Sequence, residues 1–292
     1  MNRPASNDNH ETTTQSPIEY RLDSPKRGSL RALRWEVARP RGRVGIVHGL
    51  GDHAARYEHV ARYLADRQFA VEAIDLPGHG ASYGARGHVY SWDEYRAAMD
   101  IWMEEVARHP GGDVLALLGH SMGCFVAFDW ALRNPRKLRG LILSSPPFEL
   151  VLRPSMIRVR AAQLAARLWP GYSQGNMILP SMLSQDQEMV RAHSHDPLVH
   201  YRISARLFLE FQRMRALLSK SAGELPVLTL LLHGDADPIS APAGSARWAA
   251  GAPAGRLTVR VYPGFLHEVL HEKERASVLS DLGDWLEATL TR

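Results

Sequence analysis

The chain has 292 residues, of which 45% are hydrophobic and 23% charged, the composition of a globular protein with room for one domain and an insertion. Its formal net charge of +4 is not concentrated in a Lys/Arg block, so we expect no nucleic acid partner. The single cysteine, Cys124, excludes an intrachain disulfide, and the longest apolar stretch, 225–232, is far shorter than the roughly 20 residues of a membrane span.

Residues 1–16 are polar and lack the apolar region of a secretory signal, so we expect a disordered tail and a cytoplasmic protein. Short apolar runs then alternate with helical patterns. Helices are predicted at 57–68 and 122–134, and strands at 31–38, 43–50, 69–76, 113–121, 138–145, 225–234 and 256–264. Nearly continuous apolar strands separated by helices predict an α/β fold with a mostly parallel sheet that helices cover on both faces.

Residues 147–224 interrupt this alternation, because they contain no strand signal. Apolar residues recur there at helical spacing, first at Ile157, Ala161, Leu164 and Leu168, and then at Val199, Ile203, Leu207, Phe211 and Met214. An insertion at the C-terminal ends of parallel strands lies over the place where α/β sheets bind ligands. We therefore interpret 147–224 as a helical cap, with 17–146 and 225–292 forming the core.

The stretch "GHSMG", residues 119–123, fits the pattern G-x-S-x-G. It directly follows a predicted strand and opens a predicted helix, which is the setting of a nucleophile elbow. The small residues at 119 and 123 would let the strand and the helix approach the sharp turn that projects Ser121. The sequence therefore predicts Ser121 as a nucleophile, against the alternative of an ordinary turn with a structural serine.

A serine nucleophile needs a base to take its proton and an acid to orient that base. The stretch "HGDADPI", 233–239, follows a buried strand and offers Asp235 and Asp237 as the acid. The spacing from Gly234 favours Asp237, although either aspartate could instead cap the following helix. His267 follows the last predicted strand in "YPGFLHE" and is the candidate base.

His267 also begins "HEVLH", which matches the zinc motif H-E-x-x-H. That motif works inside a helix, where residues i and i+4 share one face. Pro263 and Gly264 place His267 in a loop or at a helix start, and only Glu287 offers a poor third ligand downstream. We therefore predict no metal site and expect His271 beside the site or on the surface.

The stretch "HGLGDH", 48–53, follows another predicted strand and has the H-G-x-G form that supplies a backbone N–H to an oxyanion hole. We assign the two donors to the N–H groups of Leu50 and Met122. Taken alone, the stretch would be an ordinary glycine-rich turn. Together with the candidate nucleophile, acid and base, it indicates stabilisation of a tetrahedral intermediate.

Together these segments resemble the monoglyceride lipase / lysophospholipase branch of the α/β-hydrolases, over about residues 41–284. The resemblance is carried by "HGLGDHAARYEHVARYL", "IDLPGHGAS", "GHSMG", "HGDADPI" and "HEVLHE", with "DPLVHYRISARL" (196–207) inside the cap. It implies an α/β-hydrolase fold, with Ser121, Asp237 and His267 as triad and the amides of Leu50 and Met122 as oxyanion hole. The turn of monoglyceride lipases often reads H-G-x-G-E-H, and here Asp52 replaces the glutamate.

The cap carries signals of its own. Residues 149–220 hold nine Arg and one Lys against five acidic residues, a net charge of +5, and five of the nine methionines: Met156, Met177, Met182, Met189 and Met214. Methionines suit an acyl-chain tunnel, and basic amphipathic helices suit peripheral contact with an anionic lipid surface. The alternative is a normally packed lid with a solvated arginine face.

The sequence thus predicts a serine esterase that hydrolyses small acyl esters, monoacylglycerols or lysophospholipids, through an acyl-enzyme and without cofactor or metal. One alternative keeps the triad and changes the substrate, to an aminopeptidase or another acyl-transfer enzyme acting on a small non-lipid molecule. Another is a catalytically silent receptor or scaffold of the same fold.

Overall fold

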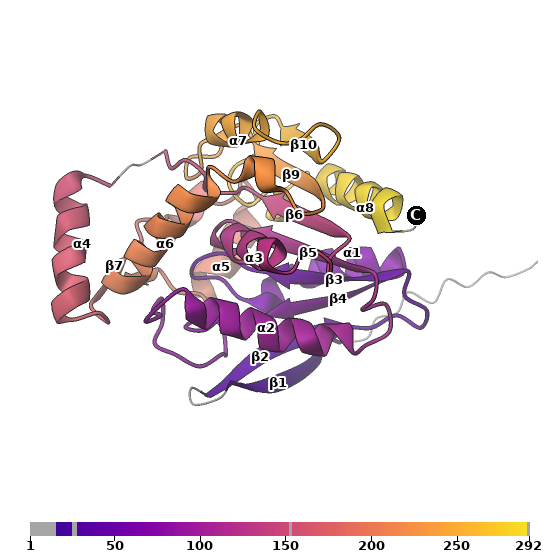
Figure 1. Cartoon of the computed structure of the whole chain (residues 1–292), viewed down its shortest axis with the longest axis horizontal. Coiled ribbons are helices and arrows are strands. Elements are labelled where there is room, and N and C mark those ends of the chain that lie inside the picture. The colour runs from indigo at the N-terminus through magenta and orange to yellow at the C-terminus, as the bar shows by residue number, and fades with distance from the viewer. Residues whose placement is uncertain (1–15, 25–27, 152–153, 291–292) are drawn as a thin grey trace, which may run out of the picture.

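The computed structural model describes residues 16–24, 28–151 and 154–290, so the predicted tail lies outside the described residues except for Ser16. The centre of the molecule is a sheet of eight strands in the order β1-β2-β4-β3-β5-β6-β9-β10 (Figure 1). The strands β2 and β4 are antiparallel to each other, as are β1 and β2, and the remaining pairs are parallel. The bounds are β1 Ile18–Ser24, β2 Gly28–Trp35, β3 Gly42–Val47, β4 Phe69–Ile74, β5 Leu115–His120, β6 Gly140–Ser144, β9 Leu228–Gly234 and β10 Leu257–Tyr262. The predicted α/β class with a mostly parallel sheet is confirmed.

Helices cover both faces of the sheet, and each face has its own apolar core. One core includes side chains of α2, α3 and α7, and the other includes side chains of α1 and α8. The strands β3, β4, β5 and β6 are buried along their whole length, which explains their nearly continuous apolar sequences. The bounds are α1 Glu58–Asp66, α2 Asp93–Ala107, α3 Met122–Arg133, α7 Pro242–Ala249 and α8 Ala276–Leu290, with the short helices η1 Ala54–Tyr57 and η4 Val269–His271.

The N-terminal edge of the sheet differs from the prediction. Strand β1 was not expected, and β2 covers 28–35 where a strand was predicted at 31–38. Most side chains of β1 are exposed or half-buried, so its sequence has no apolar signal. It is held by backbone pairing with β2 from Ile18 to Ser24, which a hydrophobic pattern does not reveal.

Residues 147–224, called the cap segment below, leave the sheet after β6 and return at β9. Their elements are α4 Met156–Leu168, β7 Ser173–Gly175, η2 Pro180–Met182, α5 Gln187–His195, β8 Arg202–Ser204, α6 Ala205–Leu218 and η3 Ala222–Glu224. The pair β7–β8 was not predicted, because three-residue strands are too short to show a period. Consequently Ile203 lies in β8, and the second predicted helix begins only at Ala205.

The first predicted helix of the cap segment forms, but its apolar side chains are not buried. In Figure 1, α4 lies at the left edge with α6 between it and the sheet, and the two helices pack against each other. Ile157, Leu164 and Leu168 are 80%, 60% and 77% exposed. Among the described helices, none has both the length and the apolar composition needed to cross a membrane.

Candidate functional site

Ser121 lies between β5 and α3, at the C-terminal end of the parallel strands. Its backbone has φ 50° and ψ −121°, a conformation that is costly for a residue with a side chain. Two glycines make room for this turn. A Cβ at position 119 would lie 2.4 Å from the carbonyl oxygen of Gly123, and one at position 123 would lie 2.3 Å from that of Val47. The G-x-S-x-G spacing is therefore required by close backbone contacts.

The structure brings three of the selected side chains together. His267, in the loop after β10, has Nε2 2.9 Å from the Ser121 hydroxyl oxygen and Nδ1 2.8 Å from Asp237 Oδ2. A carboxylate only accepts hydrogen bonds, so Nδ1 carries the proton and Nε2 is free to accept the serine proton. Asp235 does not take part: it is exposed, and its Oδ1 accepts a hydrogen bond from the Gly264 amide.

Asp237 is buried after β9 and fully hydrogen-bonded. Its Oδ1 accepts the amides of Ile239 and Ser240 at 2.8 and 2.9 Å, and its Oδ2 accepts His233 Nε2 at 3.1 Å in addition to His267. Burial acts to raise the pKa of Asp237, but His267 and His233 outweigh it, and the pKa lies well below the usual range. Asp237 is therefore ionised at neutral pH.

The charge of Asp237 acts in turn on His267. Burial lowers the pKa of this imidazole, whereas the charge and hydrogen bond of Asp237 raise it, and the net shift is upward from 6.5. The neighbouring His120 behaves oppositely: burial, reinforced by His267, lowers its pKa to about 4. His267 is therefore the imidazole placed to exchange protons with Ser121, while His120 stays neutral.

The two predicted oxyanion donors are next to Ser121. Met122 is the first residue of α3, and Leu50 lies in the loop 48–53, called the oxyanion loop below. Within the described residues, neither the Leu50 nor the Met122 amide has a hydrogen-bond acceptor. Both residues line the same cavity as Ser121, so two unused N–H groups are available to an oxygen atom bound there.

Asp52, the position that departs from the monoglyceride lipase pattern, lies in a buried charge cluster. Its carboxylate accepts the His53 amide at 2.7 Å, Arg56 Nη1 at 2.9 Å and the Tyr57 hydroxyl at 3.0 Å. Arg56 also contacts both carboxylate oxygens of Glu268, at 2.9 and 2.6 Å. The cluster connects the oxyanion loop to the residue that follows His267.

The zinc-like motif is accounted for by other contacts. Both ring nitrogens of His267 are engaged by Ser121 and Asp237, and Glu268 pairs with Arg56. His271 is buried rather than on the surface, with Nε2 3.1 Å from the Arg56 carbonyl and its ring edge-on to Tyr57. In the described part of the chain, no three His, Cys, Asp or Glu side chains are grouped so as to hold a metal ion.

Two residues that hold the triad side chains in place were not predicted from the sequence. His233 orients Asp237 and is itself held by the Ser245 hydroxyl at 2.8 Å. Ser145, at φ 50° after β6, donates its hydroxyl to the His267 carbonyl at 2.6 Å. His233 could have been suspected as the first residue of "HGDADPI", whereas nothing in the sequence indicates the role of Ser145.

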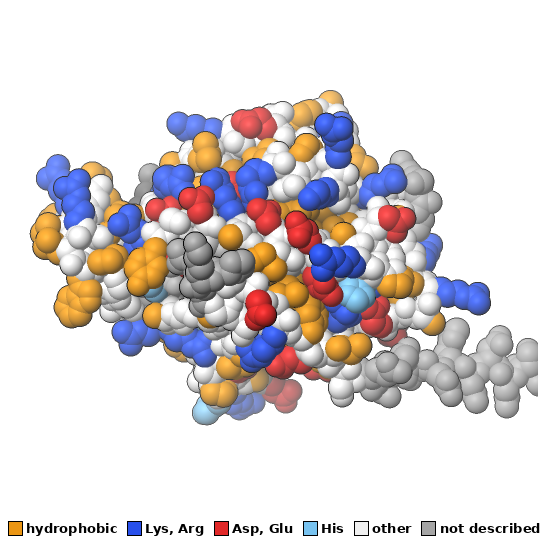
Figure 2. Space-filling view, turned by 60° about the horizontal axis from the view of Figure 1, so that its bottom comes forward, with side chains coloured by type: hydrophobic (Ala, Val, Ile, Leu, Met, Phe, Trp, Pro, Cys, Tyr) orange, Lys and Arg blue, Asp and Glu red, His pale blue; other side chains and the backbone are white. Residues whose placement is uncertain are grey.

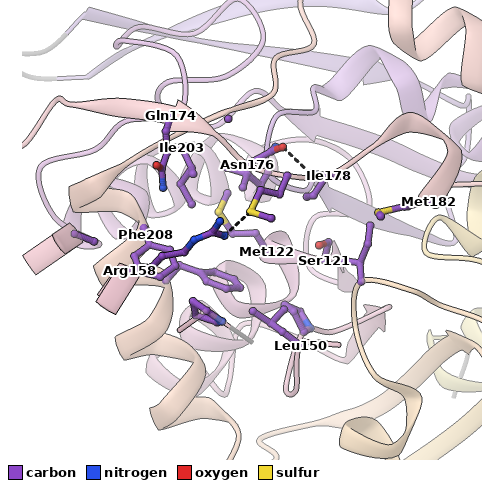
Figure 3. Close-up of a pocket in the computed structure, with 18 of the residues that line it drawn as sticks. Ser121, Met122, Leu150, Arg158, Gln174, Asn176, Ile178, Met182, Ile203 and Phe208 are labelled. Atoms are coloured by element: carbon purple, nitrogen blue, oxygen red, sulfur yellow. Dashed lines mark hydrogen bonds between the residues drawn. The ribbon is translucent and has the colours of Figure 1, made fainter. Parts of the chain in front are cut away.

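A cavity of about 320 Å³ opens above Ser121, a size at the lower end of small-molecule sites. Its walls are mostly apolar and come from both the core and the cap segment, and Figure 3 shows Ser121 and Arg158 at different ends of it. Of the five cap methionines, only Met177 and Met182 line it. Met156 is exposed, Met189 contacts Arg56 and Met214 is in the core, so two of the five methionines counted in the sequence are placed to contact an acyl chain.

A second, much smaller cavity also reaches Ser121. It measures about 20 Å³, which is room for a single water-sized group. Polar side chains line much of it, including His120, His193, Asn176 and Tyr201. Ser121 therefore faces both the larger cavity and a small one that several histidine side chains help to line.

Comparisons with known proteins agree with this geometry. Residues 38–274 match the family described as "Serine aminopeptidase, S33". The monoacylglycerol lipase of Mycolicibacterium smegmatis is 31% identical over 85% of this chain and 88% of its own length, and phospholipase YtpA of Bacillus subtilis is 28% identical over 84% and 94%. The crystal structure of Paleococcus ferrophilus monoacylglycerol lipase superposes with a TM-score of 0.81 at 32% identity, covering 89% of this chain and 99% of that one. The chain therefore belongs to the α/β-hydrolase superfamily, among its monoacylglycerol lipase-like serine hydrolases.

Proposed function

We propose that this protein is a serine esterase that hydrolyses carboxylic esters of the monoacylglycerol or lysophospholipid type. The observation that carries the proposal is the contact of His267 with both Ser121 and Asp237 at the base of a mostly apolar cavity. An acyl chain would bury its apolar surface in such a cavity.

In the proposed reaction, His267 Nε2 takes the hydroxyl proton as Ser121 attacks the ester carbonyl. The negative charge on the carbonyl oxygen is stabilised by the amides of Leu50 and Met122, and Asp237 stabilises the imidazolium. His267 then gives its proton to the departing alcohol, leaving an acyl-enzyme. A water molecule that loses its proton to His267 releases the fatty acid and restores Ser121.

An aminopeptidase is the second candidate, because the description of the matched family names one. An enzyme that binds a free α-amino group needs an available carboxylate near the nucleophile. Among the described residues that line the larger cavity there is none, and Arg158 is cationic. The carboxylates at the smaller cavity, Asp52 and Glu268, are both paired with Arg56. The electrostatics thus favour the ester.

We further propose that the cap segment covers the core and brings the cavity to an anionic lipid surface. Five apolar side chains of α4 and the residue after it are at least 60% exposed: Met156, Ile157, Leu164, Leu168 and Trp169. Arg160 and Arg167 lie on the same helix, and within the described residues no ion pair to an acidic side chain is found for either. Figure 2 shows hydrophobic and basic side chains next to each other at the left end of the molecule, where Figure 1 places α4. A cytoplasmic location stays a prediction from the sequence.

A substrate panel tests the proposal. We expect hydrolysis of 1-lauroylglycerol or lauroyl-lysophosphatidylcholine, each abolished by Ser121→Ala, and no cleavage of prolyl or leucyl p-nitroanilide. Cleavage of the p-nitroanilides with no ester hydrolysis would replace the esterase with the aminopeptidase. Failure of the wild type to react with a fluorophosphonate probe would instead support the silent scaffold.

A further inference from the structure

The stretch "DPLVHYRISARL", 196–207, has no part in the proposed reaction, although it lies close to the site. It joins α5 to α6 through β8 in the cap segment. Two of its first five residues, Asp196 and His200, contact the oxyanion loop, the segment that carries the Leu50 amide.

Among the described residues, two hydrogen bonds join the cap segment to the oxyanion loop. His53 Nε2 lies 2.8 Å from Asp196 Oδ2, and the His200 amide donates to the Gly51 carbonyl at 2.9 Å. The Asp196 carboxylate is itself fixed, because its Oδ1 accepts the Leu198 amide at 2.8 Å. The other ring nitrogen of His53, Nδ1, has no partner among the described residues, so Asp196 makes the only side-chain hydrogen bond of this imidazole.

The contact at Gly51 is close enough to require a glycine. Gly51 has φ 80°, in the left-handed region, and a Cβ there would lie 2.1 Å from the His200 carbonyl oxygen. The cap segment thus lies directly on the backbone of the residue after Leu50. On the core side, Arg56 and Tyr57 hold Asp52. The loop after Leu50 is therefore held from both sides.

We propose that Asp196 is a positioning residue that, through His53, holds the Leu50 amide where the oxyanion forms. This inference rests on the proposed function, since it concerns a donor of that reaction. It gives one residue of the cap segment a role in positioning the donor, while other residues of the segment form a wall of the cavity. Removing the Asp196 carboxylate removes the hydrogen bond to His53 Nε2, so the oxyanion loop loses one of its hydrogen bonds to the cap segment.

The effect should appear in kcat rather than in KM. Complete loss of one oxyanion donor costs about 10²–10³-fold in kcat, so we expect Asp196→Ala to lose about 10- to 100-fold, since the donor is displaced but not removed. With p-nitrophenyl acetate, whose acyl group does not fill the cavity, KM should change less than about twofold. Asp196→Asn keeps the shape and one acceptor oxygen and should lose less than Asp196→Ala.

A tetrahedral analogue separates positioning from a general structural role. A short alkyl trifluoromethyl ketone adds to Ser121 and places an oxyanion at the two amides, so its Kd should rise by the factor by which kcat/KM falls. Rates are expressed per site titrated to completion with a fluorophosphonate, which removes the contribution of unfolded protein. Glu188→Ala is the matched control, because this acidic residue of the same cap segment is exposed and is neither of the two residues that bond the oxyanion loop. It should behave as wild type.

A double-mutant cycle completes the test. If Asp196 acts through His53, the double variant His53→Ala/Asp196→Ala should lose no more than the larger single loss. Should Asp196→Ala not fold, His53→Gln provides the same comparison. The inference is overturned if kcat and ketone affinity per titrated site stay within twofold of wild type in both single variants. That result would leave ester hydrolysis by Ser121 intact, whereas an inactive wild type would remove both proposals.

Discussion

Replacing Asp237 by Asn tests the tautomer of His267, because it removes a charge while keeping the shape of the side chain. The amides of Ile239 and Ser240 donate to Oδ1, so the amide oxygen of Asn must occupy that position. The NH₂ group then takes the place of Oδ2 and faces His267 Nδ1. Nδ1 must become an acceptor, and the proton moves to Nε2, which can no longer take the proton of Ser121.

The magnitude follows from the loss of the base. Holding a triad histidine in the wrong tautomer lowers kcat about 10⁴-fold, which corresponds to about 5.4 kcal/mol of activation free energy. The backbone hydrogen bonds to position 237 remain, so we expect folded protein with a thermal midpoint close to that of wild type. The loss is thus chemical rather than structural.

The assay is hydrolysis of p-nitrophenyl butyrate, with rates divided by the concentration of folded protein. Asp235→Asn is the matched control: it changes the same residue type two positions away, on an exposed side chain whose carboxylate accepts the Gly264 amide. It should keep activity within twofold. The account fails if Asp237→Asn retains more than a tenth of wild-type kcat, or if Asp235→Asn loses as much.

Three further predictions follow from the same geometry. The kcat/KM should rise with pH through an apparent pKa above 6.5, because only the neutral imidazole of His267 accepts a proton. Burial lowers the pKa of His267, but Asp237 raises it more. A profile that is flat from pH 5.5 to 8.5 would contradict this prediction. Gly123→Ala would place a Cβ 2.3 Å from the Val47 carbonyl oxygen and 2.4 Å from that of His48. We therefore expect the free energy of unfolding to fall by about 1–3 kcal/mol or more and the thermal midpoint to be lower. An unchanged midpoint would show that this close packing does not require a glycine. The double variant Ile157→Ser/Leu168→Ser should reduce co-sedimentation with phosphatidylglycerol vesicles at least about fivefold, while p-nitrophenyl acetate hydrolysis is unchanged. The control Val261→Ser, which changes an exposed apolar side chain on β10, should leave vesicle binding unchanged. Equal binding by the wild type and both variants would contradict the proposed contact with a lipid surface.

The buried strands and the residues at their ends could be predicted because their information is local. β5 and β9 are continuous apolar runs, and the turns that follow them carry Ser121 and Asp237. In a parallel sheet these ends meet at one edge, so order along the chain was enough to select side chains that the structure places together.

The features that could not be predicted depend on contacts between distant segments. Arg56, which holds Asp52, pairs with Glu268 across 212 positions, and the hydrogen bond between His53 and Asp196 spans 143. A helical period also predicts an apolar stripe without saying what covers it. The stripe of α4 was therefore found, but not that Ile157 and Leu168 face outward.

Hydrolysis of 1-lauroylglycerol by wild type and by Ser121→Ala, followed by release of lauric acid, tests the central claim most directly. We expect rapid turnover by the wild type, at least about 10³-fold faster than by the alanine variant, and covalent labelling by a fluorophosphonate at Ser121 alone. Release of lauric acid at the wild-type rate by Ser121→Ala would show that the hydroxyl at this turn is not the nucleophile.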